Sequence, residues 1–218
     1  MIEVHMEINE YGGVLKTVRE MMSSEFRTAV ENRKLDFIRA GTSSPEFIYG
    51  ELCFCILTAN TSADMGIRTQ EIIGIEGFLN FDEDTMRKKL KEAKYRFYNV
   101  RSKFLVQSRW IVDELPRILA MKDRVEARDY LVENLKGIGY KEASHFLRNV
   151  GIFDFSILDK HILRMIKNEY PERRFLVGSR KNYLETEKTI LEFAESVSLE
   201  PGILDLYLWK IATGKLLK

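Results

Sequence analysis

The fold is decided by the stretch Leu131-Val-Glu-Asn-Leu-Lys-Gly-Ile-Gly-Tyr-Lys-Glu-Ala-Ser-His-Phe-Leu147. Two segments with helical patterning meet at its Gly137-Ile-Gly139 centre. The glycines permit a tight turn, Ile138 can tuck between the helices, and Ala143 lets their backbones approach closely. The sequence therefore predicts a helix-hairpin-helix over about residues 126–150. An ordinary αα-hairpin with a glycine turn is the alternative interpretation.

The predicted turn is suited to binding an anion. Backbone N–H groups near Gly137 and Gly139 lie at the start of the second helix, where the positive end of the helix dipole also lies. Such a turn can hold a DNA phosphate without reading any base. We therefore expect Gly137 and Gly139 to contact DNA.

Lys141 is the candidate nucleophile, because it stands two residues after the second glycine and near the start of the second helix. A lysine attacks only as the neutral amine, and both the helix dipole and partial desolvation favour that form. A cation at a helix N-terminus also acts against helix stability. That local cost is more typical of a functional position than of a surface lysine.

Asp159 is the candidate acidic partner. It lies in Phe155-Ser-Ile-Leu-Asp159-Lys-His161 and directly precedes an amphipathic segment, so it is expected to cap a helix. A capping carboxylate can also point into a cleft, and 18 residues separate it from Lys141, enough for one helix and a return. His161 could donate to a phosphate, although a lone histidine is more often structural.

A basic segment lies between Met86 and Arg109. It holds nine basic residues against one acid, Glu92, a local charge of +8 in a chain whose net charge is +1. The segment suits a polyanion, and a solvated helix face is the alternative interpretation. Asp82 to Asp84 suit a helix N-terminus, and the pattern predicts one helix with an apolar face. The residues of that face are Leu90, Ala93, Phe97, Val100 and Phe104.

The rest of the 218-residue chain indicates a mostly α-helical globular protein, with 45% hydrophobic and 31% charged residues. We expect helices over residues 14–38, with a break near Ser23-Ser24, then from Pro45 to Ala59, and over residues 65–73. Cys53 and Cys55 lie in an apolar run and are expected to be buried. Two cysteines exclude a zinc site or four-cysteine cluster unless other residues supply ligands. The N-terminal residues show no secretory signal and no apolar run reaches membrane-spanning length, so we expect a cytoplasmic protein.

These motifs resemble the helix-hairpin-helix DNA glycosylases that use a lysine nucleophile, through Leu135-Lys-Gly-Ile-Gly-Tyr-Lys141 and Leu158-Asp-Lys-His161. The absence of a cysteine cluster departs from the endonuclease III and MutY-like branches. Three further stretches resemble the 8-oxoguanine glycosylases of the second type, so that the similarity runs from about Leu52 onward. They are Leu52-Cys-Phe-Cys-Ile-Leu-Thr-Ala-Asn60, Arg96-Phe-Tyr-Asn-Val-Arg101 and Trp209-Lys-Ile-Ala-Thr-Gly-Lys-Leu-Leu-Lys218. Lys136 stands where many members have proline.

The resemblance implies an all-α fold of two helical subdomains, acting as one domain over residues 1–218, with the active-site cleft between them. It implies that Lys141 attacks the sugar of a flipped 8-oxoguanine nucleotide and that Asp159 stabilises the developing charge. It also implies DNA contacts from His161 and the hairpin, and a base pocket formed by Phe97, Trp209 and Lys218.

The resemblance implies no catalytic cofactor or metal, although carbonyl groups near Glu133, Leu135 and Ile138 could hold a structural monovalent cation. The expected partner is double-stranded DNA containing 8-oxoguanine, bound by a monomer at the nucleoid and not at a membrane.

Several alternatives remain open on the residues alone. Phe97 could belong only to the core, and Trp209 could simply anchor the last helix. A non-enzymatic helix-hairpin-helix module would need the glycine turn and the basic segment, but not Lys141 and Asp159 at this separation. A helical scaffold that binds other anions explains neither motif.

Overall fold

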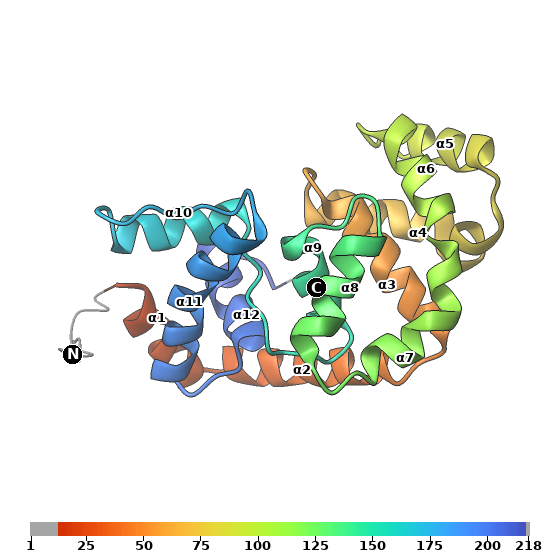
Figure 1. The fold of residues 1–218 in the computed structure, drawn as a ribbon. Helices are drawn as coiled ribbons and strands as arrows, with labels where there is room; N and C mark the ends of the chain where they lie inside the picture. The colour runs from red at the N-terminus through yellow and green to blue at the C-terminus, as the bar shows by residue number, and fades with distance from the viewer. Residues whose placement is uncertain (1–12, 217–218) are drawn as a thin grey trace. The chain divides into compact units, whose positions relative to one another are not determined.

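The computed structural model describes residues 13–216, in which every regular element is a helix and no strand is present. This confirms the expected all-α fold. The helices are α1 (Val14–Met22), α2 (Phe26–Gly41), α3 (Pro45–Thr58), α4 (Ala63–Asn80), α5 (Glu83–Glu92), α6 (Tyr98–Gln107), the 3₁₀ helix η2 (Arg109–Glu114), α7 (Leu115–Leu119), α8 (Arg124–Asn134), α9 (Tyr140–Asn149), α10 (Lys160–Glu169), α11 (Arg180–Ser196) and α12 (Pro201–Thr213) (Figure 1).

The chain folds into two compact units, as expected for two helical subdomains. Among the described residues, the terminal unit consists of residues 13–34 and 155–216, and the central unit consists of residues 35–154. The candidate nucleophile Lys141 therefore belongs to the central unit, and Asp159 belongs to the terminal unit.

The core of the central unit is built on α3, which contacts α4, α6, α7, α9 and η2. Its start is as predicted: the Ser44 hydroxyl accepts a hydrogen bond from Phe47 N–H at 3.4 Å, and Pro45 occupies the first turn. Every residue of α3 from Ile48 to Thr58 is buried. Cys53 and Cys55 are both fully buried and form no disulfide, which confirms their predicted burial.

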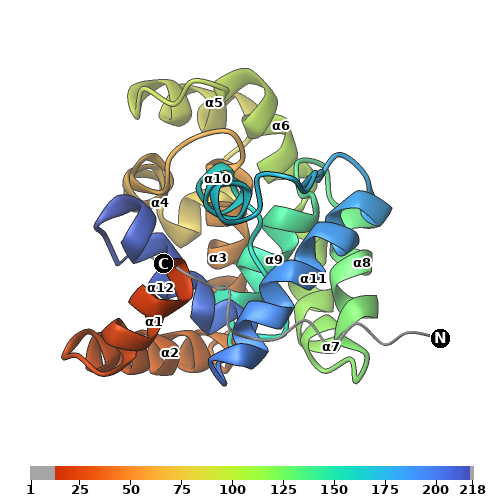
Figure 2. The ribbon, with the colours of Figure 1, turned by 90° about the vertical axis from the view of Figure 1, so that its left-hand side faces the viewer.

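The terminal unit is organised around α12, which contacts α1, α10 and α11 (Figure 2). Residues Gly202 to Leu208 of this helix are buried. The helix ends at Gly214, whose φ of 74° gives a left-handed cap. The predicted break near Ser23-Ser24 is also present, since α1 ends at Met22 and α2 begins at Phe26.

The prediction of one continuous helix through the basic segment is wrong. The segment forms α5 and α6, and they are separated at Lys94, whose φ is 59°. The next residue, Tyr95, is buried and donates from its hydroxyl to the Leu57 carbonyl at 2.6 Å. The break turns the second half of the predicted apolar face outward, so Leu90 is fully buried whereas Val100 is 50% exposed.

Helix α4 is longer than the predicted helix over residues 65–73. It runs from Ala63 to Asn80, with the Ser62 hydroxyl as its cap and a kink at Gly74, where φ is 67° and ψ is 169°. Only glycine adopts this conformation readily. At this kink the helix changes direction and continues to Asn80, beyond the predicted end at Ile73.

Candidate functional site

The helix-hairpin-helix is formed by α8 and α9, joined at residues 135–139 (Figure 1). Gly137 has a φ of 85°, and a Cβ atom there would lie 2.4 Å from Arg101 Nη1 and 2.6 Å from Phe104 Cδ2. Ile138 is 5% exposed and Ala143 is fully buried. The three residues therefore play the parts that the sequence predicts for a tight hairpin.

The amide of Gly139 already has a partner within the protein. Its N–H donates to Glu142 Oε2 at 3.2 Å, so the third residue of α9 reaches back to the residue that precedes the helix. Gly139 has a φ of −105°, which any residue adopts. The expected exposure of turn N–H groups therefore needs correction at Gly139, whose N–H is bonded to the Glu142 carboxylate in this structure.

Lys141 is the second residue of α9, as predicted. Its side chain is 24% exposed, and its Nζ lies 3.9 Å from Glu142 Oε1. The same carboxylate thus contacts both the Gly139 amide and the lysine amine. The Lys141 side chain is therefore largely covered by the protein but not sealed from solvent.

An arginine inside the hairpin was missed by the sequence analysis. Arg128 of α8 is 1% exposed, its Nη1 donates to the Ser144 hydroxyl at 3.2 Å, and its guanidinium lies 5.5 Å from the centre of the Tyr140 ring. The Tyr140 hydroxyl in turn donates to Asp129 Oδ1 at 2.8 Å. These contacts tie the start of α9 to α8. In the sequence, only the position of Arg128 between Ala127 and Leu131, which are both buried, indicates that this arginine could also be buried.

Asp159 caps α10, as predicted. Its Oδ1 accepts hydrogen bonds from His161 N–H at 2.8 Å and Ile162 N–H at 2.9 Å. Its other oxygen, Oδ2, accepts no hydrogen bond from any residue in the range 13–216. The half-buried carboxylate therefore caps the helix with one oxygen, and its other oxygen is not engaged by any described residue.

The terminal unit brings Asp159, His161 and Trp209 into one neighbourhood. The rings of His161 and Trp209 meet edge to face, with centroids 5.3 Å apart. The Trp209 Nε1–H is buried and has no hydrogen-bond partner among the described residues. The third member of the predicted base pocket, Lys218, lies outside the described residues.

Phe97, the other predicted stacking residue, belongs to the central unit. It precedes α6, with a φ of −101° and a ψ of 32°, and it is half-buried. The Arg96 guanidinium lies 4.9 Å from the centre of its ring. Phe97 is therefore not the fully buried core residue that the continuous helix implied.

The basic segment is only partly available to a ligand. Arg109 donates from Nε to the Phe78 carbonyl at 2.7 Å and also bonds the Phe81 carbonyl, and Arg101 donates to the Ala59 carbonyl at 3.2 Å. These two arginines hold the central unit together. The exposed basic side chains of the segment are Lys88, Lys91, Lys94, Arg96 and Lys103.

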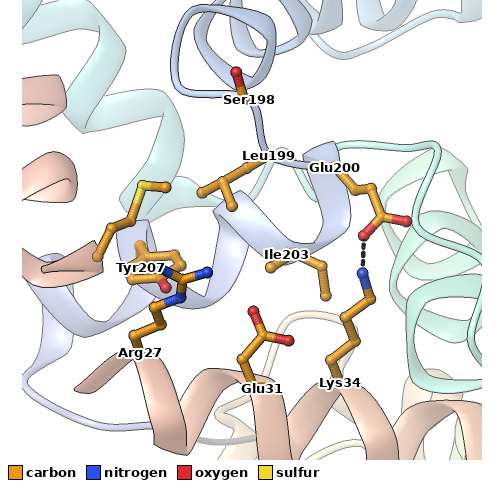
Figure 3. Close-up of a pocket in the computed structure, with 9 residues that line it drawn as sticks. Arg27, Glu31, Lys34, Ser198, Leu199, Glu200, Ile203 and Tyr207 are labelled. Carbon is orange, nitrogen blue, oxygen red and sulfur yellow. Dashed lines mark hydrogen bonds and ion pairs between the residues drawn. The ribbon is translucent and has the colours of Figure 1, made fainter. Parts of the chain in front are cut away.

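A cavity of about 360 Å³ lies elsewhere in the terminal unit. Its walls come from the end of α1, from α2, from Ser198 to Glu200, and from α12. They carry charges of both signs, and Lys34 is paired with Glu200 (Figure 3). Asp159, His161 and Trp209 are absent from its lining residues. The cavity is therefore separate from the predicted site residues of this unit.

Comparison with known proteins places the chain in a family. The sequence model of the 8-oxoguanine DNA glycosylase family matches residues 30–199. The chain belongs to this family. The matched range includes the hairpin, Lys141, Asp159 and His161, whereas Trp209 and Lys218 lie beyond it.

The family assignment rests on similarity over almost the whole chain. The 8-oxoguanine DNA glycosylase/AP lyase of Thermoplasma acidophilum is 54% identical over 192 residues, which cover 88% of this chain and 93% of the relative. That of Methanocaldococcus jannaschii is 42% identical over 94% of this chain and 99% of the relative.

Solved structures agree with these sequence relatives. The crystal structure of the Methanocaldococcus jannaschii glycosylase/lyase in complex with 15mer DNA containing 8-oxoguanine has a TM-score of 0.89 at 41% identity, and covers 94% of this chain and 99% of that one. The 8-oxoguanine DNA glycosylase of Thermotoga maritima has a TM-score of 0.88 at 40% identity, over 94% and 98%. The family's fold is therefore the fold of this chain.

The described residues offer no grouping of three or more His, Cys, Asp or Glu side chains that could hold a metal ion. Within the same range, the helices are too short or too polar to cross a membrane.

Proposed function

We propose that this chain excises 8-oxoguanine from duplex DNA and then cleaves the strand at the abasic site, as the first steps of base excision repair. The observation that carries the proposal is the position of Lys141, the second residue of the helix that follows the glycine turn, in a chain of the 8-oxoguanine DNA glycosylase family. The names of its relatives, 8-oxoguanine DNA glycosylase/AP lyase, give the same pair of activities.

In the proposed reaction, the neutral amine of Lys141 attacks C1′ of the flipped nucleotide. The C1′–N9 bond breaks, the base leaves with the bonding electrons and takes up a proton, and a C1′–Nζ bond forms. The C1′–O4′ bond then breaks as a proton passes from Nζ to O4′, and the opened sugar is left as a protonated Schiff base on Nζ. Removal of a C2′ proton then expels the 3′ phosphate by β-elimination, which breaks the strand.

Asp159 supplies negative charge beside the sugar as positive charge develops on it. Oδ2, which accepts no hydrogen bond from residues 13–216, supports this role, because the carboxylate can face a substrate without giving up its cap on α10. The carboxylate also has the chemistry to move protons in the later steps.

We propose that Phe97 and Trp209 stack on the extruded base and that Lys218 contributes to its recognition. The buried Nε1–H of Trp209 is a donor that a substrate oxygen could satisfy. Gly137, Gly139 and His161 would hold phosphates, and the Glu142 carboxylate must release the Gly139 N–H for that amide to do so.

The reaction needs no cofactor, and we propose that a monovalent cation at the hairpin has only a structural role. The last carbonyls of α8 have no partner within the helix, and the Leu135 carbonyl accepts only a long hydrogen bond of 3.4 Å from Ile138 N–H. A higher melting temperature in potassium chloride than in the chloride of a bulky organic cation would support the site.

We further propose that the two units act as one domain in a monomer bound to DNA at the nucleoid. A single unfolding transition and a molecular mass of about 25.5 kDa in light scattering are expected.

The direct test uses a duplex that carries one 8-oxoguanine, with an unmodified duplex as the control. The protein should release the base, cleave the strand and, in the presence of borohydride, form a covalent protein–DNA band with the lesion duplex alone. Binding to both duplexes without excision or trapping would instead indicate a non-enzymatic helix-hairpin-helix module.

A further inference from the structure

The loop before Asp159 is held by two side chains of α11 that the proposed reaction does not use. Residues Phe155 to Leu158 form this loop, and each of them is at most 5% exposed. Tyr183 and Glu187 lie one turn apart on α11, so both face the same side of that helix. They are 2% and 3% exposed, respectively.

Both side chains bond the loop through its backbone. The Tyr183 hydroxyl donates to the Ser156 carbonyl at 2.9 Å and accepts from Leu158 N–H at 3.3 Å. Glu187 Oε1 accepts from Ser156 N–H at 3.0 Å. The peptide groups on both sides of Ile157 are thereby fixed to α11.

This anchoring reaches Asp159 in one further step. The Asp159 N–H donates to the Ile157 carbonyl at 2.9 Å, which closes a tight turn on the anchored peptides. The carboxylate of Asp159 then begins α10 by capping His161 N–H and Ile162 N–H. Asp159 is therefore held from the α10 side by its own cap and from the loop side by α11.

We propose that Tyr183 and Glu187 are positioning residues that fix the Asp159 carboxylate in its catalytic orientation. This inference rests on the proposed catalytic role of Asp159. Neither residue needs to touch DNA. Without the Tyr183 hydroxyl, the buried Ser156 carbonyl and Leu158 N–H lose a partner, and buried unpaired groups drive the loop to rearrange. A displacement of about 1 Å at a catalytic group can cost about 100-fold in rate.

The primary measurement is the rate constant of 8-oxoguanine excision in a single turnover with enzyme in excess. Tyr183→Phe should lower this rate constant by about 10- to 100-fold and leave the affinity for the lesion duplex within about twofold. Glu187→Gln keeps an oxygen that accepts from Ser156 N–H, so it should excise faster than Glu187→Leu. Excision at the wild-type rate by both Tyr183→Phe and Glu187→Leu would overturn the inference.

Tyr49→Phe is a matched control. Tyr49 is a fully buried tyrosine of the central unit, and its hydroxyl donates to the Leu105 carbonyl at 2.7 Å. Like Tyr183→Phe, the Tyr49→Phe control removes a buried tyrosine hydroxyl that donates to a backbone carbonyl. It should lower the melting temperature as Tyr183→Phe does, while its excision rate constant stays within about twofold of wild type.

A double-mutant cycle with Asp159→Asn separates positioning from general destabilisation. Once the carboxylate is gone, Tyr183→Phe should lower the remaining rate by less than about threefold, because the group that it positions is absent. Fully multiplicative losses would overturn the inference. An Asp159→Asn protein with wild-type turnover would instead refute the proposed role of Asp159. A slow Asp159→Asn protein beside Tyr183→Phe and Glu187→Leu proteins that excise at the wild-type rate would refute only the positioning role.

Discussion

The two helices that carry the candidate catalytic residues begin in opposite ways. Helix α10 begins at Asp159, whose own carboxylate accepts two backbone N–H groups. Helix α9 follows Gly139, which has no side chain to offer, and Glu142 must reach back to bond its N–H. The proposed acid thus lies where a negative charge stabilises a helix, and the proposed nucleophile, Lys141, lies where a positive charge destabilises one.

The relation between stability and proposed function therefore differs between the two sites. At α10, the carboxylate that caps the helix is also the one proposed to act on the substrate, so its removal should affect both stability and catalysis. At α9, the amine makes no contribution to the helix start, and the nearby Glu142 carboxylate offsets its charge. Substitutions at the two sites should therefore all slow catalysis but should change stability to different extents.

The largest effect is expected from Lys141→Gln. Excision and borohydride trapping should fall by at least about 1,000-fold, because no other group replaces the amine. Affinity for the lesion duplex should remain. The free energy of unfolding should change by less than about 0.5 kcal/mol, since a cation leaves a helix N-terminus. Single-turnover assays and thermal unfolding check both parts, and normal trapping by this variant would assign the nucleophile to another lysine.

Asp159→Asn should lower excision by about 100- to 1,000-fold, because the charge that faces the developing cation is lost. An asparagine oxygen still caps α10, so stability should fall by less than about 1 kcal/mol. Asp159→Ala removes both functions and should destabilise the protein further. Equal melting temperatures for the Asn and Ala variants would show that the Asp159 cap adds no measurable stability. The proposed difference between the starts of α9 and α10 would then be wrong.

The two hairpin glycines should differ in how they tolerate alanine. At Gly137, the positive φ of 85° and the contacts with Arg101 and Phe104 leave no room for a Cβ atom. Gly137→Ala should therefore lower stability by about 2–4 kcal/mol. At Gly139, the nearest atom to a new Cβ is Glu142 Oε2 at 3.2 Å, and Gly139→Ala should cost less than about 1 kcal/mol. Chemical denaturation measures both, and similar losses would contradict this account of the turn.

The smallest effect is expected from the exposed lysines of the basic segment. Lys88→Ala or Lys103→Ala should weaken binding to damaged and undamaged duplexes alike and reduce the slope of log affinity against log salt by about 1. Lys188→Ala in the terminal unit removes an exposed lysine that pairs with Glu185 and serves as the control. An unchanged slope after both basic-segment substitutions would place the DNA elsewhere.

The local sequence predicts correctly those features that depend on residues adjacent in the chain. The start of α3 follows from Ser44-Pro45, the cap of α10 from Asp159, and the hairpin from its two glycines, and all three are present. The break between α5 and α6 could not be foreseen, because Lys94 is not a residue that favours a positive φ. That break depends on Tyr95 reaching Leu57 in another helix.

The residues that support the candidate site also depend on contacts between distant parts of the chain, so the sequence alone did not identify them. Tyr183 and Glu187 follow Asp159 by 24 and 28 positions. They reach the loop before Asp159 only because α11 packs against it. Arg128 resembles an ordinary charged residue in an amphipathic helix until α9 covers it. Local patterns identify residues with chemical roles, whereas the residues that orient them depend on tertiary contacts.

The central claim is that Lys141 forms the covalent intermediate, and the most direct test locates that bond. Wild-type protein is incubated with the 8-oxoguanine duplex and borohydride, the complex is digested with nuclease and protease, and the peptides are sequenced by mass spectrometry. The account predicts that the sugar remnant is attached to Nζ of Lys141. A remnant on another residue, such as Lys136 or the N-terminal amine, would contradict it.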